Sequence, residues 1–180
     1  GTPISSLMAW IELVKSKFNA EDDSLILEME RDVKRLEMVA DRFSKIGSKP
    51  VLENQRVFPG VKGYVDYFKV RSSGKIEFSV TGDKEVSALM NVPLFDWVLE
   101  NLLKNAVNAI EGNGKIEAQI IENVAKEQVF IDITDTGKGI PRLKFETIFQ
   151  PGYTTRKRGW GVGLSLTKRI IEHYHQGLIF

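Results

Sequence analysis

An aspartate and two glycines follow directly after an alternating apolar segment in the second half of the chain. Residues 128–134 alternate between apolar and polar side chains, the pattern of a half-buried strand, and Asp135, Gly137 and Gly139 come next. A carboxylate at a strand end accepts hydrogen bonds from an exocyclic amine such as that of adenine, and glycines let a flat ring lie against the backbone. Taken alone, the pattern fits an ordinary strand-to-loop turn better.

Two asparagines one helical turn apart offer a second kind of chemistry. Asn101 and Asn105 lie in the segment 93–110, which predicts a strongly apolar helix, and their spacing places both on one face. An amide oxygen is a suitable ligand for a hard cation such as Mg²⁺. Ordinary exposed or capped asparagines would have the same spacing, so the pair alone leaves both interpretations open.

A glycine-rich segment, residues 159–165, opens the last predicted helix. Free backbone N–H groups at a helix start, made approachable by glycine, can bind an anion. The basic residues 156–158 could neutralise a polyphosphate there, or be solvated surface. The segment is not a Walker loop, because no Gly-Lys-Ser/Thr follows. It is not a convincing dinucleotide motif either, because no strand precedes it.

The elements around these groups predict a two-layer α/β sandwich of the α+β class. Periodicity of 3.6 residues predicts helices, and alternation predicts strands, with a polar hairpin joining the last two strands. The predicted helices are residues 61–70, 93–110 and 164–174, and the predicted strands are residues 75–80, 115–121 and 128–134. Helices and an antiparallel sheet in such blocks are typical of this architecture.

The first 47 residues predict an antiparallel helical hairpin. Apolar residues recur at steps of three and four in residues 4–18, and at a period near 3.5 in residues 25–43. Two helices of this size cannot bury both apolar stripes against each other. We therefore expect a homodimer through residues 1–47, with packing on the neighbouring domain as the alternative.

The composition narrows the range of partners. A net charge of +1 over 180 residues gives no field that argues for nucleic acid or an anionic membrane surface. The absence of cysteine excludes disulfides and thiolate zinc sites, and it fits a cytoplasmic domain. No apolar run reaches membrane-spanning length, so no membrane span is expected within this chain. Its abrupt start inside a helical pattern predicts a piece of a longer protein.

Taken in order, these features resemble the N, G1, F and G2 boxes of sensor histidine kinases from two-component systems. The boxes correspond here to Asn101 and Asn105, to residues 135–139, to Phe145 and Phe149, and to residues 159–164. The ATP-binding domain of that family has the Bergerat fold, shared with gyrase, mismatch-repair ATPases and a chaperone family. The resemblance implies an ATP-binding catalytic domain at residues 48–180, lacking its final hairpin. Residues 1–47 would be the dimerisation and phosphotransfer hairpin, cut just after the phosphoacceptor motif.

The resemblance also implies a role for each matching residue. Asn105 would hold Mg²⁺, Asn101 would line the triphosphate site, and Thr2 would orient water when the regulator is dephosphorylated. Asp135 would bind the adenine amine, and residues 150–158 would form a mobile lid. The remaining positions expected to contact ATP are Gly137, Gly139, Ile140, Phe149, Thr154, Thr155, Lys157, Gly159, Gly161, Val162, Gly163 and Leu164.

The implied activity is that of an ATP-dependent protein histidine kinase. The γ-phosphoryl group would pass to a histidine and then to an aspartate of a response regulator. Residues 1–7 look like the tail of the phosphoacceptor motif, whose histidine would lie three positions before Gly1. His173 and His175 do not replace it and are expected at the surface. Asn108 stands where the family usually has lysine, which puts one phosphate contact in doubt.

Two alternatives stay open on the sequence. An ATPase or serine kinase of the same superfamily would place a glutamate base four residues before the metal-binding asparagine, where this chain has Asn101. The neighbouring Glu100 points about 100° around the helix, which argues against that chemistry. A non-catalytic scaffold that binds ATP without transferring its phosphoryl group would share every motif.

Overall fold

The computed structural model describes most of the chain, in two compact units that divide between Pro50 and Val51. Thr2, Lys157 and Gly159, three of the residues expected at the site, lie outside the described residues. The described ranges are residues 3–18, 23–47, 50–72, 74–155 and 161–180.

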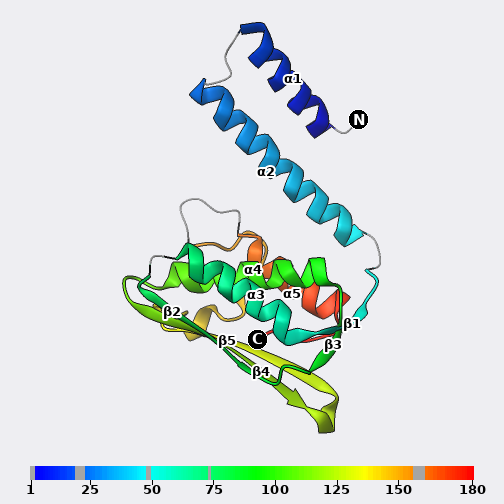
Figure 1. The fold of residues 1–180 in the computed structure, drawn as a ribbon, viewed down its shortest axis with the longest axis vertical. Coiled ribbons are helices and arrows are strands. Elements are labelled where there is room, and N and C mark those ends of the chain that lie inside the picture. The colour runs from blue at the N-terminus through cyan, green and yellow to red at the C-terminus, as the bar shows by residue number, and fades with distance from the viewer. Residues whose placement is uncertain (1–2, 19–22, 48–49, 73, 156–160) are drawn as a thin grey trace. The chain divides into compact units, whose positions relative to one another are not determined.

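The first unit is a pair of helices that pack side by side, α1 (Pro3–Phe18) and α2 (Ser24–Gly47), as Figure 1 shows. Asp23 begins the second helix, because its carboxylate accepts hydrogen bonds from two backbone N–H groups of the first turn. Ile11 of α1 and Val33 of α2 are buried. The two helices predicted for this part of the chain are therefore present.

Large apolar side chains on both helices stay exposed to solvent. Trp10 is 64% exposed and Phe18 is 67% exposed. Among the side chains that the structure describes in this unit, those exposed in this way are Leu7, Trp10, Leu13, Val14, Phe18, Leu25, Met29 and Leu36. The pair of helices thus buries only part of its apolar surface, and burial against a second copy stays a prediction.

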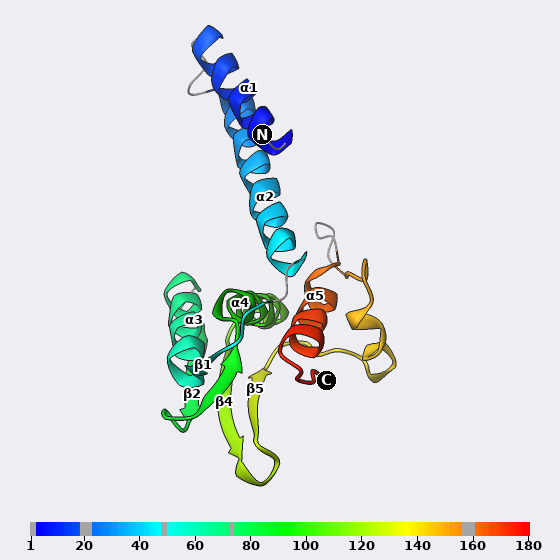
Figure 2. The same cartoon turned by 90° about the vertical axis from the view of Figure 1, so that its right-hand side faces the viewer.

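The second unit has two layers, a three-stranded sheet and a set of helices that cover one face of it (Figure 2). The sheet order is β2 (Ile76–Gly82), β4 (Gly114–Asn123) and β5 (Gln128–Asp135). The helical elements are α3 (Val57–Arg71), α4 (Val92–Ala109), α5 (Gly163–Arg169), and the short turns η1 (Val124–Lys126), η2 (Arg142–Lys144) and η3 (Thr147–Phe149). This arrangement confirms the predicted two-layer α+β sandwich.

One strand pairing differs from the prediction. β4 and β5 are antiparallel, as their hairpin predicts, but β2 pairs with β4 in parallel, with Phe78 opposite Ile116. The expectation of a wholly antiparallel sheet was wrong because α4 lies between these two strands in sequence. A helical crossover returns the chain in the same direction.

A second, two-stranded sheet was not predicted from the sequence. β1 (Glu53–Arg56) pairs antiparallel with β3 (Ser87–Met90), with Glu53 opposite Met90. Each strand has four residues, and β1 is wholly polar, so neither gives the alternation by which a strand is recognised.

α4 is the central helix of the core. Leu99 and Leu103 of α4 are buried together with Val61 of α3 and Ile116 of β4. Asn91 caps the helix, since its side-chain oxygen accepts a hydrogen bond from a backbone N–H of the first turn. Burying a large aliphatic side chain stabilises a fold by about 1.5–3 kcal/mol. The core therefore fixes α4, and with it the residues on its remaining face.

The last helix continues past α5 as a π-helical turn, Ile170–Tyr174, and ends at His175. The His175 ring packs edge-on against Phe95, and its Nε2 accepts a hydrogen bond from the backbone N–H of Asn91 at 3.1 Å. Its Nδ1 lies 3.0 Å from the carbonyl oxygen of Ile170. His173 is exposed, as expected, whereas His175 is only half-exposed and is held by these contacts. Its partner Asn91 lies 84 positions away, where no local pattern could reveal it.

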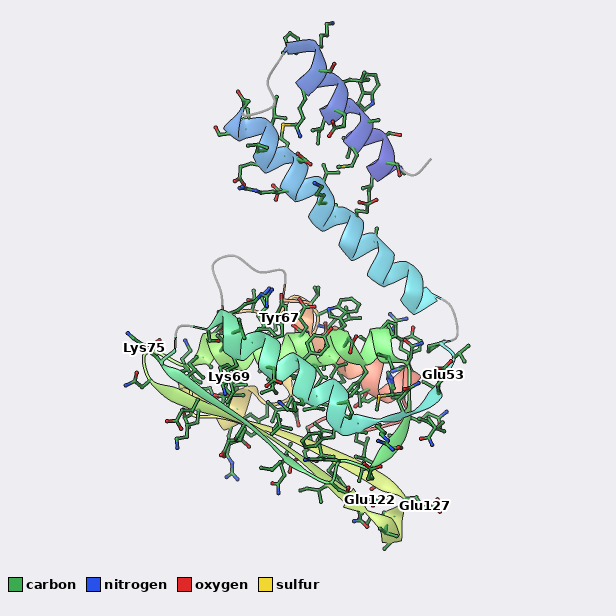
Figure 3. All side chains as sticks on the ribbon, in the orientation of Figure 1. Glu53, Tyr67, Lys69, Lys75, Glu122 and Glu127 are labelled. Atoms are coloured by element: carbon green, nitrogen blue, oxygen red, sulfur yellow. The ribbon has the colours of Figure 1, made fainter. Side chains whose placement is uncertain are left out.

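Polar side chains lie on the outer face of the sheet and at the end of the β4–β5 hairpin, where Val124 is exposed as well. Exposed and buried residues alternate along β4, with Glu117 and Gln119 exposed and Ala118 buried between them. Figure 3 shows Glu122 and Glu127 at the hairpin end. Of the helices described, none combines the length and the apolar character needed to cross a bilayer.

An ion pair between α1 and α2 makes the stability of the first unit depend on pH. Glu30 accepts hydrogen bonds from Lys15 of α1 at 2.6 Å and from Lys34 of α2 at 2.5 Å. These two ammonium groups lower the pKa of Glu30 from 4.5 to about 2. A carboxylate whose pKa is lowered by folding stabilises the folded state at every pH above its ordinary pKa. This contribution is lost as the pH falls toward 2.

We therefore expect Glu30→Gln to lower the melting temperature of the hairpin at pH 7, by a difference that shrinks as the pH falls from 4.5 toward 2. Circular dichroism melting curves of wild type and variant across this range measure the effect. Glu28→Gln is the matched control, because Glu28 is exposed and pairs with Arg31 on the same helix. A difference between Glu30→Gln and wild type that is the same at pH 7 and pH 2 would contradict the assignment.

Candidate functional site

α4 carries both predicted asparagines on a half-buried face. Asn101 donates a hydrogen bond from Nδ2 to Oγ1 of Thr167 on α5 at 2.9 Å. Asn105 lies one turn further along α4 on the same face, as the i, i+4 spacing predicts. The side chain of Asn108 turns back onto its own helix, where its amide donates to the carbonyl of Lys104. Asn101 and Asn105 are therefore the α4 amides that face the site.

The turn that follows β5 is docked on the C-terminal end of α4. Asp135 closes this turn, since its Oδ1 accepts a hydrogen bond from the N–H of Gly137 at 2.8 Å. The N–H of Lys138 donates to the carbonyl of Ala109, the last residue of α4, at 3.0 Å. A Cβ atom on Gly137 would lie 2.6 Å from the Cβ of Ala109, so only glycine fits. The turn thus meets α4 one helical turn after Asn105.

Gly139 is required in the same turn for a different reason. Its φ of +67° lies in the left-handed region, and a Cβ placed there would meet nothing within 4 Å. The backbone at Gly139 therefore faces open space, beside the side chain of Ile140, which is 47% exposed. An accessible backbone next to an apolar side chain is a surface on which a flat ring can lie.

The two phenylalanines after this turn differ in their surroundings. Phe149 of η3 is half-buried and lies near α5, with Nζ of Lys168 at 5.2 Å from its ring centroid. Phe145 is 51% exposed. Phe149 therefore joins η3 to α5.

A backbone contact closes the base of the loop before α5. The N–H of Gly152 donates to the carbonyl of Gly161 at 3.0 Å. Gly161 has a φ of +65°, and a Cβ there would come within 2.4 Å of the carbonyl carbon of Gly152. Thr154 and Thr155, which follow Gly152 in this loop, are exposed. Val162, directly after Gly161, is exposed as well.

The start of α5 lies against Asn101. A Cβ placed on Gly163 would approach Oδ1 of Asn101 to 2.6 Å, so the absence of a side chain there is what admits the amide. Leu164 is half-buried in the same turn. Figure 2 shows α4 and α5 side by side, and the two helices are in contact.

Two residues that shape the site were not predicted from the sequence. Thr167 is only 1% exposed, and it holds the side chain of Asn101. The signal that could have revealed it is a polar residue on the apolar face of a helix, beside Leu166 and Ile170. Ala109 meets Gly137 through its Cβ and its carbonyl, and no pattern in the sequence connects these two positions.

A cavity of about 570 Å³ lies elsewhere, between the end of α3, α4 and the start of β2. Tyr67, Arg71 and Lys75 are among its lining residues, with Glu100 and Lys104 from α4. Figure 3 shows Tyr67 on α3 and Lys75 just before β2. None of the predicted site residues lines this cavity. The candidate site is instead assembled from α4, the turn after β5 and α5.

Asn105 is the residue of this site that fits a magnesium ion. Among the residues that the structure describes, no cluster of three or more histidine, cysteine, aspartate or glutamate side chains could hold a metal. A single amide oxygen suits Mg²⁺, which keeps several waters and takes other oxygens from the phosphates of its ligand. The donor set therefore fits a metal that arrives together with a polyphosphate.

Comparison with known proteins gives a family match for half of the chain. The protein-family model described as histidine kinase-, DNA gyrase B- and HSP90-like ATPase matches residues 91–180. Sensor histidine kinase ZraS of Salmonella typhimurium is 43% identical over 82 residues, which cover 46% of this chain and 17% of ZraS. The chain spans between 17% and 35% of the length of the first three curated relatives that it matches.

Solved structures with the same fold include histidine kinases. The nucleotide-free catalytic domain of histidine kinase ThkA is 27% identical, with a TM-score of 0.63 over 69% of this chain and 82% of that domain. A structure of ThkA in complex with the response regulator protein TrrA matches 96% of this chain and 52% of that one. Its TM-score is 0.62 at 22% identity. The residues matched by the family model contain α4, the turn after β5 and α5.

The contact between Gly137 and Ala109 gives a test of how the turn is held. We expect Gly137→Ala to destabilise the second unit by about 1–3 kcal/mol, because a methyl group is forced into a filled contact. Gly63→Ala is the matched control, since a Cβ at this helical glycine meets nothing within 4 Å. It should stabilise the unit by about 0.5–1 kcal/mol. Urea unfolding followed by tryptophan fluorescence measures both, and a Gly137→Ala variant as stable as wild type would show that the docking contact is absent.

Proposed function

The chain belongs to the histidine kinase-, DNA gyrase B- and HSP90-like ATPase family, and from this membership we propose that it is the catalytic part of a sensor histidine kinase. It would transfer the γ-phosphoryl group of ATP to a histidine expected upstream of Gly1. From there the group would pass to an aspartate of a response regulator. The homology to sensor histidine kinases supports this reaction over others of the same fold.

The observation that carries the proposal is the docking of the Asp135 turn on the end of α4. It brings the turn that carries this carboxylate to the end of the helix that carries Asn105. The carboxylate would accept a hydrogen bond from the exocyclic amine of adenine. The open backbone at Gly139, beside Ile140, would receive the ring, while Gly137 keeps the turn against Ala109.

The phosphates would lie along α4 toward the start of α5. Asn105 would bind Mg²⁺ through its amide oxygen, and the ion would supply charge neutralisation and orientation of the β- and γ-phosphates. Gly161, Val162, Gly163 and Leu164 would border the phosphates from the other side. Phosphoryl transfer asks little covalent chemistry of the protein, so the work of these residues is to bind and to orient.

The loop between β5 and α5 would cover the nucleotide. Phe149 anchors its first part against α5, and the Gly152–Gly161 contact closes its base. Thr154 and Thr155 are exposed on it and would face the phosphates. The roles proposed for Lys157 and Gly159 at the phosphates, and for Thr2 in orienting water, rest on the sequence resemblance alone.

The helical hairpin would join two copies of the chain. Its exposed apolar side chains, such as Trp10 and Phe18, provide the surface that a second hairpin would bury. A response regulator is the other proposed partner, and the ThkA structure with TrrA supports it by showing such a complex for a protein of this fold. Such a kinase would work in the cytoplasm, where ATP is available.

The test is a phosphorylation assay on a longer form of the protein that includes the residues before Gly1. With γ-labelled ATP and Mg²⁺ we expect protein-bound label that is labile in acid and stable in base, as phosphohistidine is. Asp135→Asn and Asn105→Asp should each lower the initial rate about tenfold or more, the loss expected for one interaction with a charged partner. Asp132→Asn, on the exposed face of the same strand, is the control.

Each competing function predicts a different outcome of this assay. Acid-stable label on the protein would indicate a serine kinase, and free phosphate without protein label would indicate an ATPase. Nucleotide binding without either product would indicate a scaffold. Any of these three results would overturn the histidine kinase assignment, and equal rates for Asp135→Asn and wild type would overturn the proposed adenine contact.

A further inference from the structure

We propose that Asn101 is a positioning residue that fixes α5 on α4, rather than a ligand of the phosphates. This inference rests on the proposed function, because it concerns how the nucleotide site is held in shape. It replaces the direct phosphate contact expected of Asn101 from the sequence with a contact between two helices.

The side chain of Asn101 is engaged by α5 through a hydrogen bond whose acceptor is buried. Its Nδ2 lies 2.9 Å from Oγ1 of Thr167, and Thr167 is 1% exposed. Breaking this hydrogen bond is costly on the Thr167 side, because a fully buried hydroxyl group has no access to water as a replacement partner. One N–H of the Asn101 amide is therefore directed at α5.

A second contact lies one turn earlier on the same helix. A Cβ placed on Gly163 would come within 2.6 Å of Oδ1 and 2.9 Å of Nδ2 of Asn101. Gly163 and Thr167 are four residues apart, so they share one face of α5. Asn101 thus lies against two successive turns of α5, with its amide in van der Waals contact with the first and hydrogen-bonded to the second.

This double contact connects the two sides of the proposed nucleotide site. Asn101 lies one turn before Asn105 on α4, and Gly163 directly follows Val162 at the start of α5. Val162 is held in turn, since its carbonyl accepts hydrogen bonds from the backbone N–H of Leu166 and the hydroxyl group of Ser165. Asn101 therefore sets the spacing between Asn105, whose amide is proposed to bind the metal, and the glycine-rich segment at the start of α5.

The experiment compares Asn101→Ala, Thr167→Val and Thr167→Ser with wild type in two measurements. Hydrogen exchange of the α5 backbone amides is measured without nucleotide, and affinity for Mg²⁺·ATP is measured by calorimetry. We expect Asn101→Ala and Thr167→Val each to speed α5 exchange and weaken ATP binding about fivefold, the factor of one ordinary hydrogen bond. The double variant should be no worse than either single variant, and Thr167→Ser, which keeps the hydroxyl group, should restore both values.

Two further variants, Gly163→Ala alone and Gly163→Ala combined with Asn101→Ala, test the contact at Gly163 by the same measurements. Gly163→Ala should weaken ATP binding in the wild-type background, because its methyl group meets the Asn101 amide. The same change should be tolerated when Asn101 is already alanine, because the space is then vacant. Additive effects of the two changes would contradict the contact.

The outcomes separate this inference from the proposed function. If Asn101→Ala weakens ATP binding while Thr167→Val binds as wild type and α5 exchange stays unchanged, Asn101 is a direct ligand and the inference is wrong. If neither variant changes either quantity, the contact has no role and the inference is also wrong. If wild type binds no ATP, the proposed function fails, and the exchange measurements without nucleotide still decide whether Asn101 holds α5.

Discussion

The site depends on one contact, the seating of the turn after β5 on the carboxyl-terminal end of α4. The hydrogen bond from Lys138 N–H to the Ala109 carbonyl is 3.0 Å long, and the bare Cα of Gly137 lets the two backbones approach. An exposed loop carrying a carboxylate would otherwise have many conformations, at a cost of about 1–2 kcal/mol for each residue that binding had to order. Seating it on a helix that the core already fixes removes most of that cost before a ligand arrives.

α4 therefore acts as the common support of the whole site. Its apolar faces are held by α3 and the sheet, its start is joined to the end of the chain through Asn91 and His175, and its last residue carries the turn. The remaining face presents two amides to the region where the other parts converge. Side chains on a helix that is buried in this way keep their relative positions, which is the preorganisation that binding and phosphoryl transfer require.

The sequence predicted correctly those elements whose structure is determined by neighbouring residues. The alternation of β5, the following glycines and the long apolar helix α4 each follow from short-range rules, and the structure has them nearly where those rules place them. Prediction from the sequence failed for features that depend on contacts between residues far apart in the chain. The parallel pairing of β2 with β4, the hydrogen bond of His175 with Asn91 and the hydrogen bond of Asn101 with Thr167 each depend on residues far along the chain. Such contacts exist only after the layers have packed, so no window of neighbouring residues contains them.

The most direct measurement is a crystal structure of this chain with Mg²⁺ and a non-hydrolysable ATP analogue. We expect adenine on the Gly139 backbone with its amine hydrogen-bonded to Asp135, and the metal bound by the amide oxygen of Asn105. Nucleotide bound instead in the cavity beside Arg71 and Lys75, or a metal coordinated away from α4, would contradict this expectation.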